Sequence, residues 1–111
     1  MNDHELLQLA AKAAGYEFLE VVAHGCALVR KSPNLRGYHR WAPLTDDGDA
    51  LRLAVKLQIE VRNFNGASHA GRHNQFWCTE NWFPDGDPFA ATRRAITRAA
   101  AELARAQGEK Q

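Results

Sequence analysis

The stretch WAPLTDDGDALRLAVKL (residues 41–57) could start a helix or form a metal-binding loop. Three aspartates lie within positions 46–49, directly before apolar residues with helical spacing. A calcium loop needs a bidentate glutamate at its twelfth position, but counting from the first two aspartates reaches Leu57 or Gln58. A carboxylate at a helix start instead accepts an unpaired backbone N–H and lies near the positive end of the helix dipole. The pattern therefore predicts a helix over 47–57.

The same pattern recurs in PDGDPFAATRRAITRAAAELARA (residues 84–106). Asp87 fits the capping position, and Pro88 fits the first helical position, where its missing N–H has no cost. A helix over 88–106 is expected, and its buried side comprises Phe89, Ile96, Ala99, Ala100 and Leu103. An opening helix over 3–14 is also expected, capped by Asn2 or Asp3 and ended by Gly15.

Four strands are expected between the helices. β-branched and aromatic residues predict strands over 17–23 and 26–30 with a reversal at His24-Gly25, and alternation predicts strands at about 57–64 and 75–80. Polar, glycine-containing segments at 31–40 and 64–74 are interpreted as loops. The order α-β-β-α-β-β-α predicts an α+β fold with three helices packed on one four-stranded antiparallel sheet.

In the helix over 47–57, Ala50, Leu51, Leu53, Ala54 and Leu57 form the expected apolar side.

The length and composition of the chain indicate its number of domains and its expected location. Its 111 residues predict a single domain over 1–111 with a frayed tail at 107–111. No apolar run approaches the roughly 20 residues that cross a bilayer, and the acidic, amphipathic start does not resemble a secretory signal, so a cytoplasmic location is expected. Cys26 and Cys78 lie in apolar surroundings and are expected to be buried thiols. A net charge of +1 gives no overall attraction to nucleic acid or lipid.

Three blocks of the sequence resemble the phage ABA sandwich domain family of small phage and prophage proteins. They are LLQLAAKAAG (residues 6–15), RWAPLTDDGDALRLAVKL (residues 40–57) and DPFAATRRAITRAAAEL (residues 87–103), together about half of the chain. The resemblance implies a compact domain in which helices cover a β-sheet, encoded by a bacteriophage or prophage. The resemblance implies no biochemical activity and no catalytic residue for this chain. The segments 31–40 and 64–74 fall outside the resemblance, and this member's own function is expected there.

One basic segment could contact nucleic acid. RKSPNLRGYHR contains Arg30, Lys31, Arg36 and Arg40 around Tyr38, without an acidic residue. Four cations beside an aromatic ring can bind phosphates and stack a base. The alternative is a solvated loop whose charges discourage pairing between sheet edges.

The last predicted helix carries a second basic feature. Arg94, Arg98 and Arg105 fall within one narrow sector of that helix, nearly opposite its apolar side. Such a row can contact an acidic protein or a phosphate backbone. It can equally be the solvent-facing side of an amphipathic helix.

Aromatic residues gather around the strand near 75–80. Trp77 and Thr79 are expected on the face opposite Phe76 and Cys78. If helices cover one side of the sheet, Trp77 is exposed together with Phe64, where both could anchor a protein partner. If helices cover both sides, Trp77 is a core residue. The sequence leaves both alternatives open.

Residues for catalysis or metal binding are sparse. His69, His73 and Cys78 could supply zinc ligands, but the intervening glycines argue against a helix that would align the histidines. Ser32 and Ser68 lie in predicted loops without a nucleophile motif, and no glycine-rich phosphate loop is present. No catalytic residue, metal ligand or cofactor is therefore predicted.

These observations predict a non-enzymatic phage or prophage accessory protein in the cytoplasm of the bacterial host. It is expected to bind an unknown host or phage protein, or a second copy of itself, and not a membrane. The alternative is a nucleic-acid-binding module that uses the segment 30–40 and the arginine row.

Overall fold

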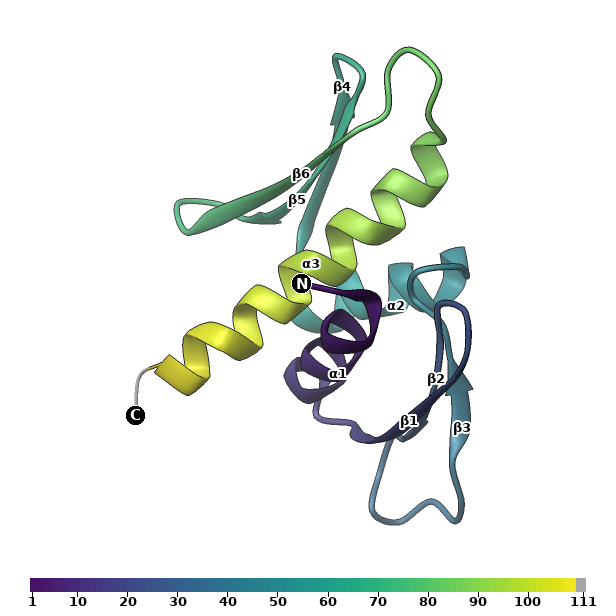
Figure 1. The fold of residues 1–111 in the computed structure, drawn as a ribbon. Coiled ribbons are helices and arrows are strands. Elements are labelled where there is room, and N and C mark those ends of the chain that lie inside the picture. Colours follow the sequence, from purple (N-terminus) through teal and green to yellow (C-terminus); the bar gives the residue numbers. More distant parts are fainter. Residues whose placement is uncertain (110–111) are drawn as a thin grey trace.

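The computed structural model describes residues 1–109, in which two three-stranded antiparallel sheets lie on either side of a layer of helices (Figure 1). The elements are α1 (Asp3–Ala14), β1 (Glu17–Ala23), β2 (Cys26–Arg30), β3 (His39–Trp41), α2 (Asp47–Leu57), β4 (Glu60–Phe64), β5 (Ala67–Arg72), β6 (Phe76–Asn81) and α3 (Pro88–Glu109). A helix followed by a three-stranded meander therefore occurs twice, and α3 follows both. The α+β class is confirmed. The single four-stranded sheet is wrong, because strands β1-β2-β3 and β4-β5-β6 form separate sheets.

Two of these strands lie in segments that the sequence predicts to be loops. β3 is short and ends at Trp41, and β5 is the middle strand of the second sheet. The connection from β4 to β5 is the dipeptide Asn65-Gly66, with φ of 55° and 74°. Two successive left-handed residues form the type I′ turn that best fits the twist of a hairpin. β5 itself consists mainly of small residues, so its strand structure depends on pairing with neighbours on both sides.

The aspartates start helices, as predicted. Asp46 caps α2, because its Oδ2 accepts the backbone N–H of Asp49 at 2.8 Å. Asp87 precedes α3, and its Oδ1 accepts the N–H of Phe89 at 2.9 Å. Asn2 is the residue that caps α1.

The remaining carboxylates at the start of α2 are also paired. Asp49 accepts the N–H of Ala42 at 2.9 Å and an Arg52 N–H at 2.8 Å. Asp47 accepts from Arg93 of α3 at 2.6 Å. These carboxylates therefore connect α2 to the preceding loop and to α3.

The core lies where α3 crosses α1. Alanines dominate the contact, which allows the two helix backbones to approach closely, and the buried set includes Leu7, Ala10, Ala11, Ala95, Ala99, Ala100 and Leu103. The expected buried side of α3 is confirmed for Ile96, Ala99, Ala100 and Leu103. It is wrong for Phe89, which is exposed because a groove separates the first turn of α3 from α2 and β4.

The apolar side of α2 is also only partly confirmed. Ala50, Leu53 and Ala54 are buried, but Leu51 is 62% exposed because it faces the same groove.

The C-terminal end of the chain differs from the prediction of a frayed tail. Residues 107–109 continue α3, and the rest of the predicted tail, 110–111, lies outside the described residues.

Within residues 1–109, no helix combines the length and apolar character that crossing a bilayer requires. Both cysteines are buried, as expected.

Candidate functional site

The outer face of sheet β4-β5-β6 is not covered by a helix in the described part of the chain, because α3 packs on the opposite face (Figure 1). Ser68, Ala70 and Cys78 point toward α3 and are buried. The alternating positions point outward, leaving Trp77 38% and Phe64 51% exposed. The predicted division of strand faces is thus confirmed. Trp77 is exposed and is not a core residue, which is the first of the two alternatives that the sequence leaves open.

Five side chains define what we call the aromatic face: Arg62, Phe64, His69, Trp77 and Thr79. The Arg62 guanidinium lies 4.9 Å from the centroid of the Trp77 ring. The Phe64 and His69 rings are 4.8 Å apart between centroids and inclined by 31°. His69 Nδ1 and Thr79 Oγ1 are 3.0 Å apart, within hydrogen-bonding distance. Both exposed aromatic rings are therefore held in place by neighbouring polar side chains.

Small residues in the middle strand explain this arrangement. Gly71 of β5 pairs with Glu60 on one side and Trp77 on the other. Its lack of a side chain leaves open the space across which Arg62 reaches Trp77. A Cβ at Gly71 would lie only 2.1 Å from the Phe76 carbonyl oxygen, so the backbone itself demands glycine here.

A polar cluster around the buried Ser68 connects the inner side of the same sheet to α3. Asn63 Oδ1 accepts hydrogen bonds from Ser68 Oγ at 2.6 Å and from Thr92 Oγ1 at 2.9 Å. The two hydroxyl groups also lie 2.9 Å apart. Because the buried Ser68 hydroxyl would be costly if it were unpaired, these contacts favour the observed position of β4 and β5 on the start of α3.

The predicted arginine row lies apart from the aromatic face, and each of its members has an acidic partner. Arg94 pairs with Asp3 of α1 and Arg105 with Glu102 of α3. Arg98 pairs with Glu80 of β6 and donates to the Thr79 carbonyl oxygen at 3.0 Å. The three arginines line a shallow pocket of about 400 Å³ together with Met1, Leu6, Glu80 and Glu102. The row therefore joins α3 to α1 and β6, and its positive charge is largely compensated.

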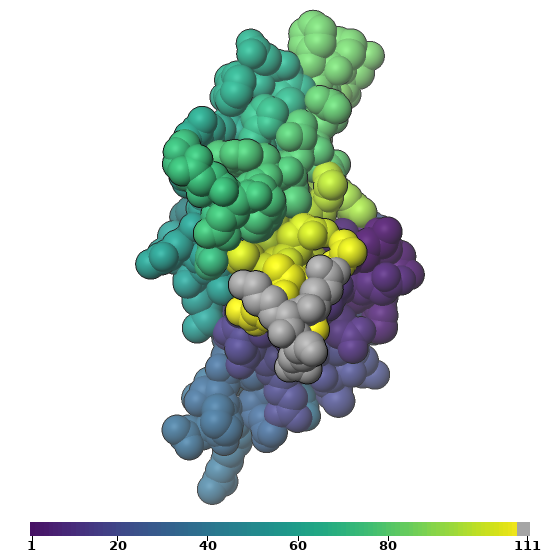
Figure 2. Space-filling view, turned by 90° about the vertical axis from the view of Figure 1, so that its left-hand side faces the viewer, coloured from purple at the N-terminus to yellow at the C-terminus, as the bar shows by residue number. Residues whose placement is uncertain are grey.

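The predicted basic segment projects at the end of the molecule away from the β4–β5 hairpin (Figures 1 and 2). Arg30 pairs with Glu17 and lies 5.8 Å from the Tyr38 ring, whose hydroxyl donates to Glu17 at 3.3 Å. Lys31, Arg36 and Arg40 form no ion pair with an acid of residues 1–109.

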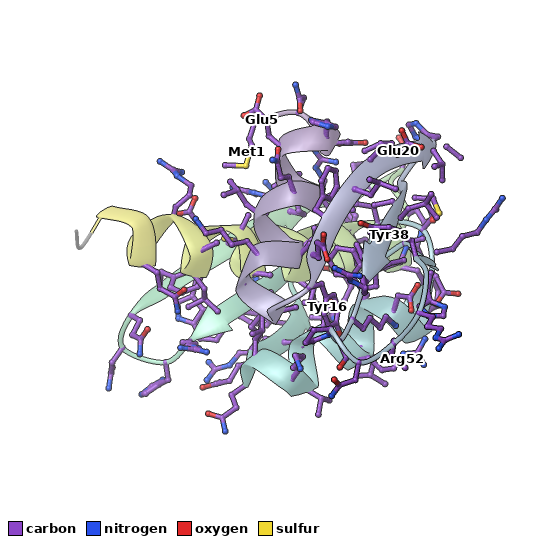
Figure 3. All side chains as sticks on the ribbon, turned by 90° about the horizontal axis from the view of Figure 1, so that it is seen from below. Met1, Glu5, Tyr16, Glu20, Tyr38 and Arg52 are labelled. Atoms are coloured by element: carbon purple, nitrogen blue, oxygen red, sulfur yellow. The ribbon has the colours of Figure 1, made fainter. Side chains whose placement is uncertain are left out.

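Tyr16 and Lys56, which the sequence did not single out, lie beside this segment. The Tyr16 ring, which is labelled in Figure 3, is 5.7 Å from the Lys31 ammonium and 5.6 Å from that of Lys56, and it packs edge-on against Trp41. Burial raises the pKa of the Tyr16 hydroxyl, and the charge of Asp49 raises it further. Tyr16 therefore remains a neutral ring between cations.

An apolar groove of about 450 Å³ runs between α2, α3 and β4. Leu51, Val61, Phe89 and Ile96 line it, and the Asp47–Arg93 ion pair lies at its edge. Sequence reasoning assigned most of these side chains to the core and did not predict the groove. Their spacing along the chain gives no signal that would have shown it.

The structure separates the residues considered for zinc binding and for catalysis. His69 and Cys78 lie on opposite faces of the second sheet. Burial raises the pKa of the Cys78 thiol, although the nearby Arg98 opposes this effect. Ser68 lies in β5 and not in a loop, and it is fully buried. Within residues 1–109, no three histidine, cysteine, aspartate or glutamate side chains gather where they could hold a metal ion.

Comparison of the chain with protein-family models, curated proteins and solved structures found no match. The resemblance to the phage ABA sandwich domain family therefore stays a prediction, and the functional argument depends on the geometry of the molecule.

Proposed function

We propose that this chain is a non-enzymatic binding protein that binds another protein through the aromatic face. The observation that carries the proposal is the exposure of Trp77 and Phe64 on a sheet face without a helical cover among the described residues. Tryptophan and arginine are enriched among the residues that dominate binding energy at protein interfaces. Trp77 and Arg62 supply both types within one contact.

The aromatic face is also ordered before any partner arrives. Arg62 lies against Trp77, and His69 connects Phe64 to Thr79. Side chains that already occupy defined positions lose less conformational freedom on binding, which favours affinity.

The biological setting is a further part of the proposal. The resemblance of residues 40–57 and 87–103 to phage proteins supports a bacteriophage or prophage origin, and hence action in the cytoplasm of a bacterial host. The partner is then a host or phage protein that presents an apolar surface.

A pull-down with matched variants tests the proposal. The tagged protein is used to capture partners from infected and uninfected host cells, and the affinity for any captured protein is then measured with purified components. Trp77→Ala is expected to weaken binding by about tenfold or more, as expected for an interface anchor. Leu19→Ala is the control, because Leu19 is a similarly exposed apolar residue in β1 of the other sheet. Equal binding by the wild type and Trp77→Ala would exclude the aromatic face.

The second candidate is nucleic-acid binding by the basic segment around Tyr38. It is favoured by Lys31, Arg36 and Arg40 having no acidic partner in residues 1–109, and by the neighbouring rings of Tyr16 and Tyr38. It is not favoured by the arginines of α3, which are paired.

Titration of labelled single-stranded DNA and RNA at low salt tests the second candidate. A nucleic-acid binder loses affinity steeply as salt rises. No binding at about 50 μM protein, within the usual range for non-specific contacts, would exclude it.

A further inference from the structure

β4 is an open sheet edge. It is the first strand in the order β4-β5-β6, and all five of its residues are exposed. Its register with β5 runs without interruption from Glu60 to Phe64. A straight edge of this kind presents backbone N–H and C=O groups that can pair with another strand.

The other sheet edges are protected in ways that β4 is not. β1 has two irregularities in its register with β2, and such bulges twist an edge away from pairing. β3 has only three residues. On β6, Arg98 donates to the carbonyl oxygen of Thr79 at 3.0 Å. β4 is therefore the edge best suited to receive a partner strand.

The β4–β5 turn fixes which backbone groups point outward. In a two-residue type I′ hairpin, the flanking residues Phe64 and Ala67 exchange hydrogen bonds, and the bonding residues of each strand then alternate. Glu60 and Arg62 consequently bond to β5. The N–H and C=O groups of Val61 and Asn63 point away from the sheet.

The charges on β4 select one antiparallel register between two copies of this strand. Within one chain, Glu60 and Arg62 already form an ion pair at 3.1 Å. With the twofold axis at Val61, each Glu60 also lies opposite Arg62 of the other chain, so the four charges alternate in sign on the outer face. A twofold axis at Glu60 would place two glutamates opposite each other, and an axis at Arg62 would place two arginines opposite each other, which is unfavourable. The strand is thus self-complementary in charge, as a twofold interface requires.

We propose that β4 pairs with β4 of a second copy of this chain about a twofold axis at Val61. The two Val61 residues exchange backbone hydrogen bonds, and each Asn63 N–H donates to the Ile59 carbonyl oxygen of the other chain. The pairing ends there, because the Ile59 N–H already donates to Ala54. The second sheets of the two chains then form one continuous sheet.

The apolar groove supports this choice of partner. Val61 contributes its side chain to the groove beside the exposed Leu51 and Phe89. An added strand would place a second Val61 directly beside the first, at the open side of this groove. Dimerisation would therefore bury apolar surface that the single chain leaves in water. Arg62 belongs to both the aromatic face and this interface, but Trp77 and Phe64 stay exposed, and the observations that support dimerisation do not depend on the function proposed above.

A charge-swap experiment tests the interface and its register. Sedimentation equilibrium of the wild type is measured from about 1 μM to about 1 mM, which spans weak and moderate affinities. We expect a monomer–dimer equilibrium. Glu60→Arg and Arg62→Glu each create like-charge pairs across the twofold axis, so each is expected to weaken its own dimer by about tenfold.

Mixing the two variants supplies the decisive measurement. A Glu60→Arg chain opposite an Arg62→Glu chain restores two attractive pairs, so the mixture is expected to form a heterodimer with nearly wild-type affinity. Arg40→Glu, an exposed charge in β3, is the control and is expected to dimerise like the wild type. Circular dichroism tests whether each variant folds. If Arg62→Glu does not fold because it loses the contact with Trp77, Glu60→Arg, which keeps Arg62, still tests the interface.

The outcomes are distinct. Dimerisation of the wild type, weakening by Glu60→Arg and recovery in the mixture support the proposal. If Arg62→Glu does not fold, weakening by Glu60→Arg alone supports it. A wild type that stays monomeric at about 1 mM overturns it. A dimer that Glu60→Arg leaves unchanged, or folded variants that fail to associate when mixed, also overturn it.

Discussion

The two halves of the chain have the same order of elements but differ in how much they bury. In the first half, α1 buries Leu6, Leu7 and three alanines against α3 and sheet β1-β2-β3. In the second half, α2 buries fewer residues and leaves Leu51 in water. The edges differ too, because β1 is bulged and β4 is regular. The first helix is therefore more deeply packed than the second, and the second half has the more regular sheet edge.

The two tryptophans that occupy the sheets provide the largest expected contrast. Trp41 of β3 is 2% exposed, and Trp77 of β6 is 38% exposed. Trp41→Ala is expected to lower the free energy of unfolding by about 3–5 kcal/mol, because it leaves a large cavity in the core. Trp77→Ala is expected to cost less than about 1.5 kcal/mol, since it removes a partly exposed ring and one exposed cation–π contact.

Urea denaturation of both tryptophan variants, followed by far-ultraviolet circular dichroism, measures this contrast. Comparable losses in the two variants would contradict the assignment of Trp77 to a binding surface.

The helices offer a second, smaller contrast. Leu7→Ala in α1 removes a fully buried side chain and is expected to cost about 2–5 kcal/mol. Leu51→Ala in α2 removes a side chain that mostly contacts water, so the change is expected within about 0.5 kcal/mol. Thermal unfolding at low protein concentration measures both changes. At high concentration, Leu51→Ala tests in addition whether the groove contributes to association. A large loss from Leu51→Ala in the monomer would show that α2 is packed as tightly as α1.

The alkaline pH dependence of stability is expected to show the smallest effect. Burial raises the pKa of the Cys78 thiol in the folded protein above its ordinary value near 9.0. Below that pH the thiol is neutral in both states and its contribution is fully present. As pH rises through 9 and toward the folded pKa, the unfolded thiol ionises first, so stability falls. Unfolding of the wild type and Cys78→Ala at pH 7 and pH 10 should show the steeper decline in the wild type. Parallel declines would show that other groups, such as Tyr16, are responsible.

The sequence predicts the elements whose signals are local. Aspartate caps and helical spacing place the three helices, and the strands over 17–23 and 26–30 appear with the predicted bounds. β5 was missed because Ala67, Ala70 and Gly71 show no alternation of large apolar residues. The Asn65-Gly66 turn before it is, however, a strong hairpin signal that the sequence does contain. That the strands form two sheets depends on contacts between distant residues, which local patterns do not show.

The candidate site was predictable to a similar extent. Alternation placed Trp77 and Phe64 on faces that become one surface if the helices lie on the other side. Arg62 and His69 join them only through pairing across strands, so no spacing along the chain shows their contacts. For the arginine row, the spacing along the chain predicts more uncompensated positive charge than the folded protein has. Its positive charge is compensated by Asp3 and Glu80, which lie in other elements.

The position of α3 in the sequence also has a consequence for synthesis. This helix packs against α1, α2, β5 and β6, but it is translated after all of them. Until residues 88–104 leave the ribosome, the inner face of sheet β4-β5-β6 has no helix to pack against, and α1 can pack only against β1 and α2. A nascent chain that lacks α3 is therefore expected to depend on chaperones or to aggregate, and the final helix completes the fold.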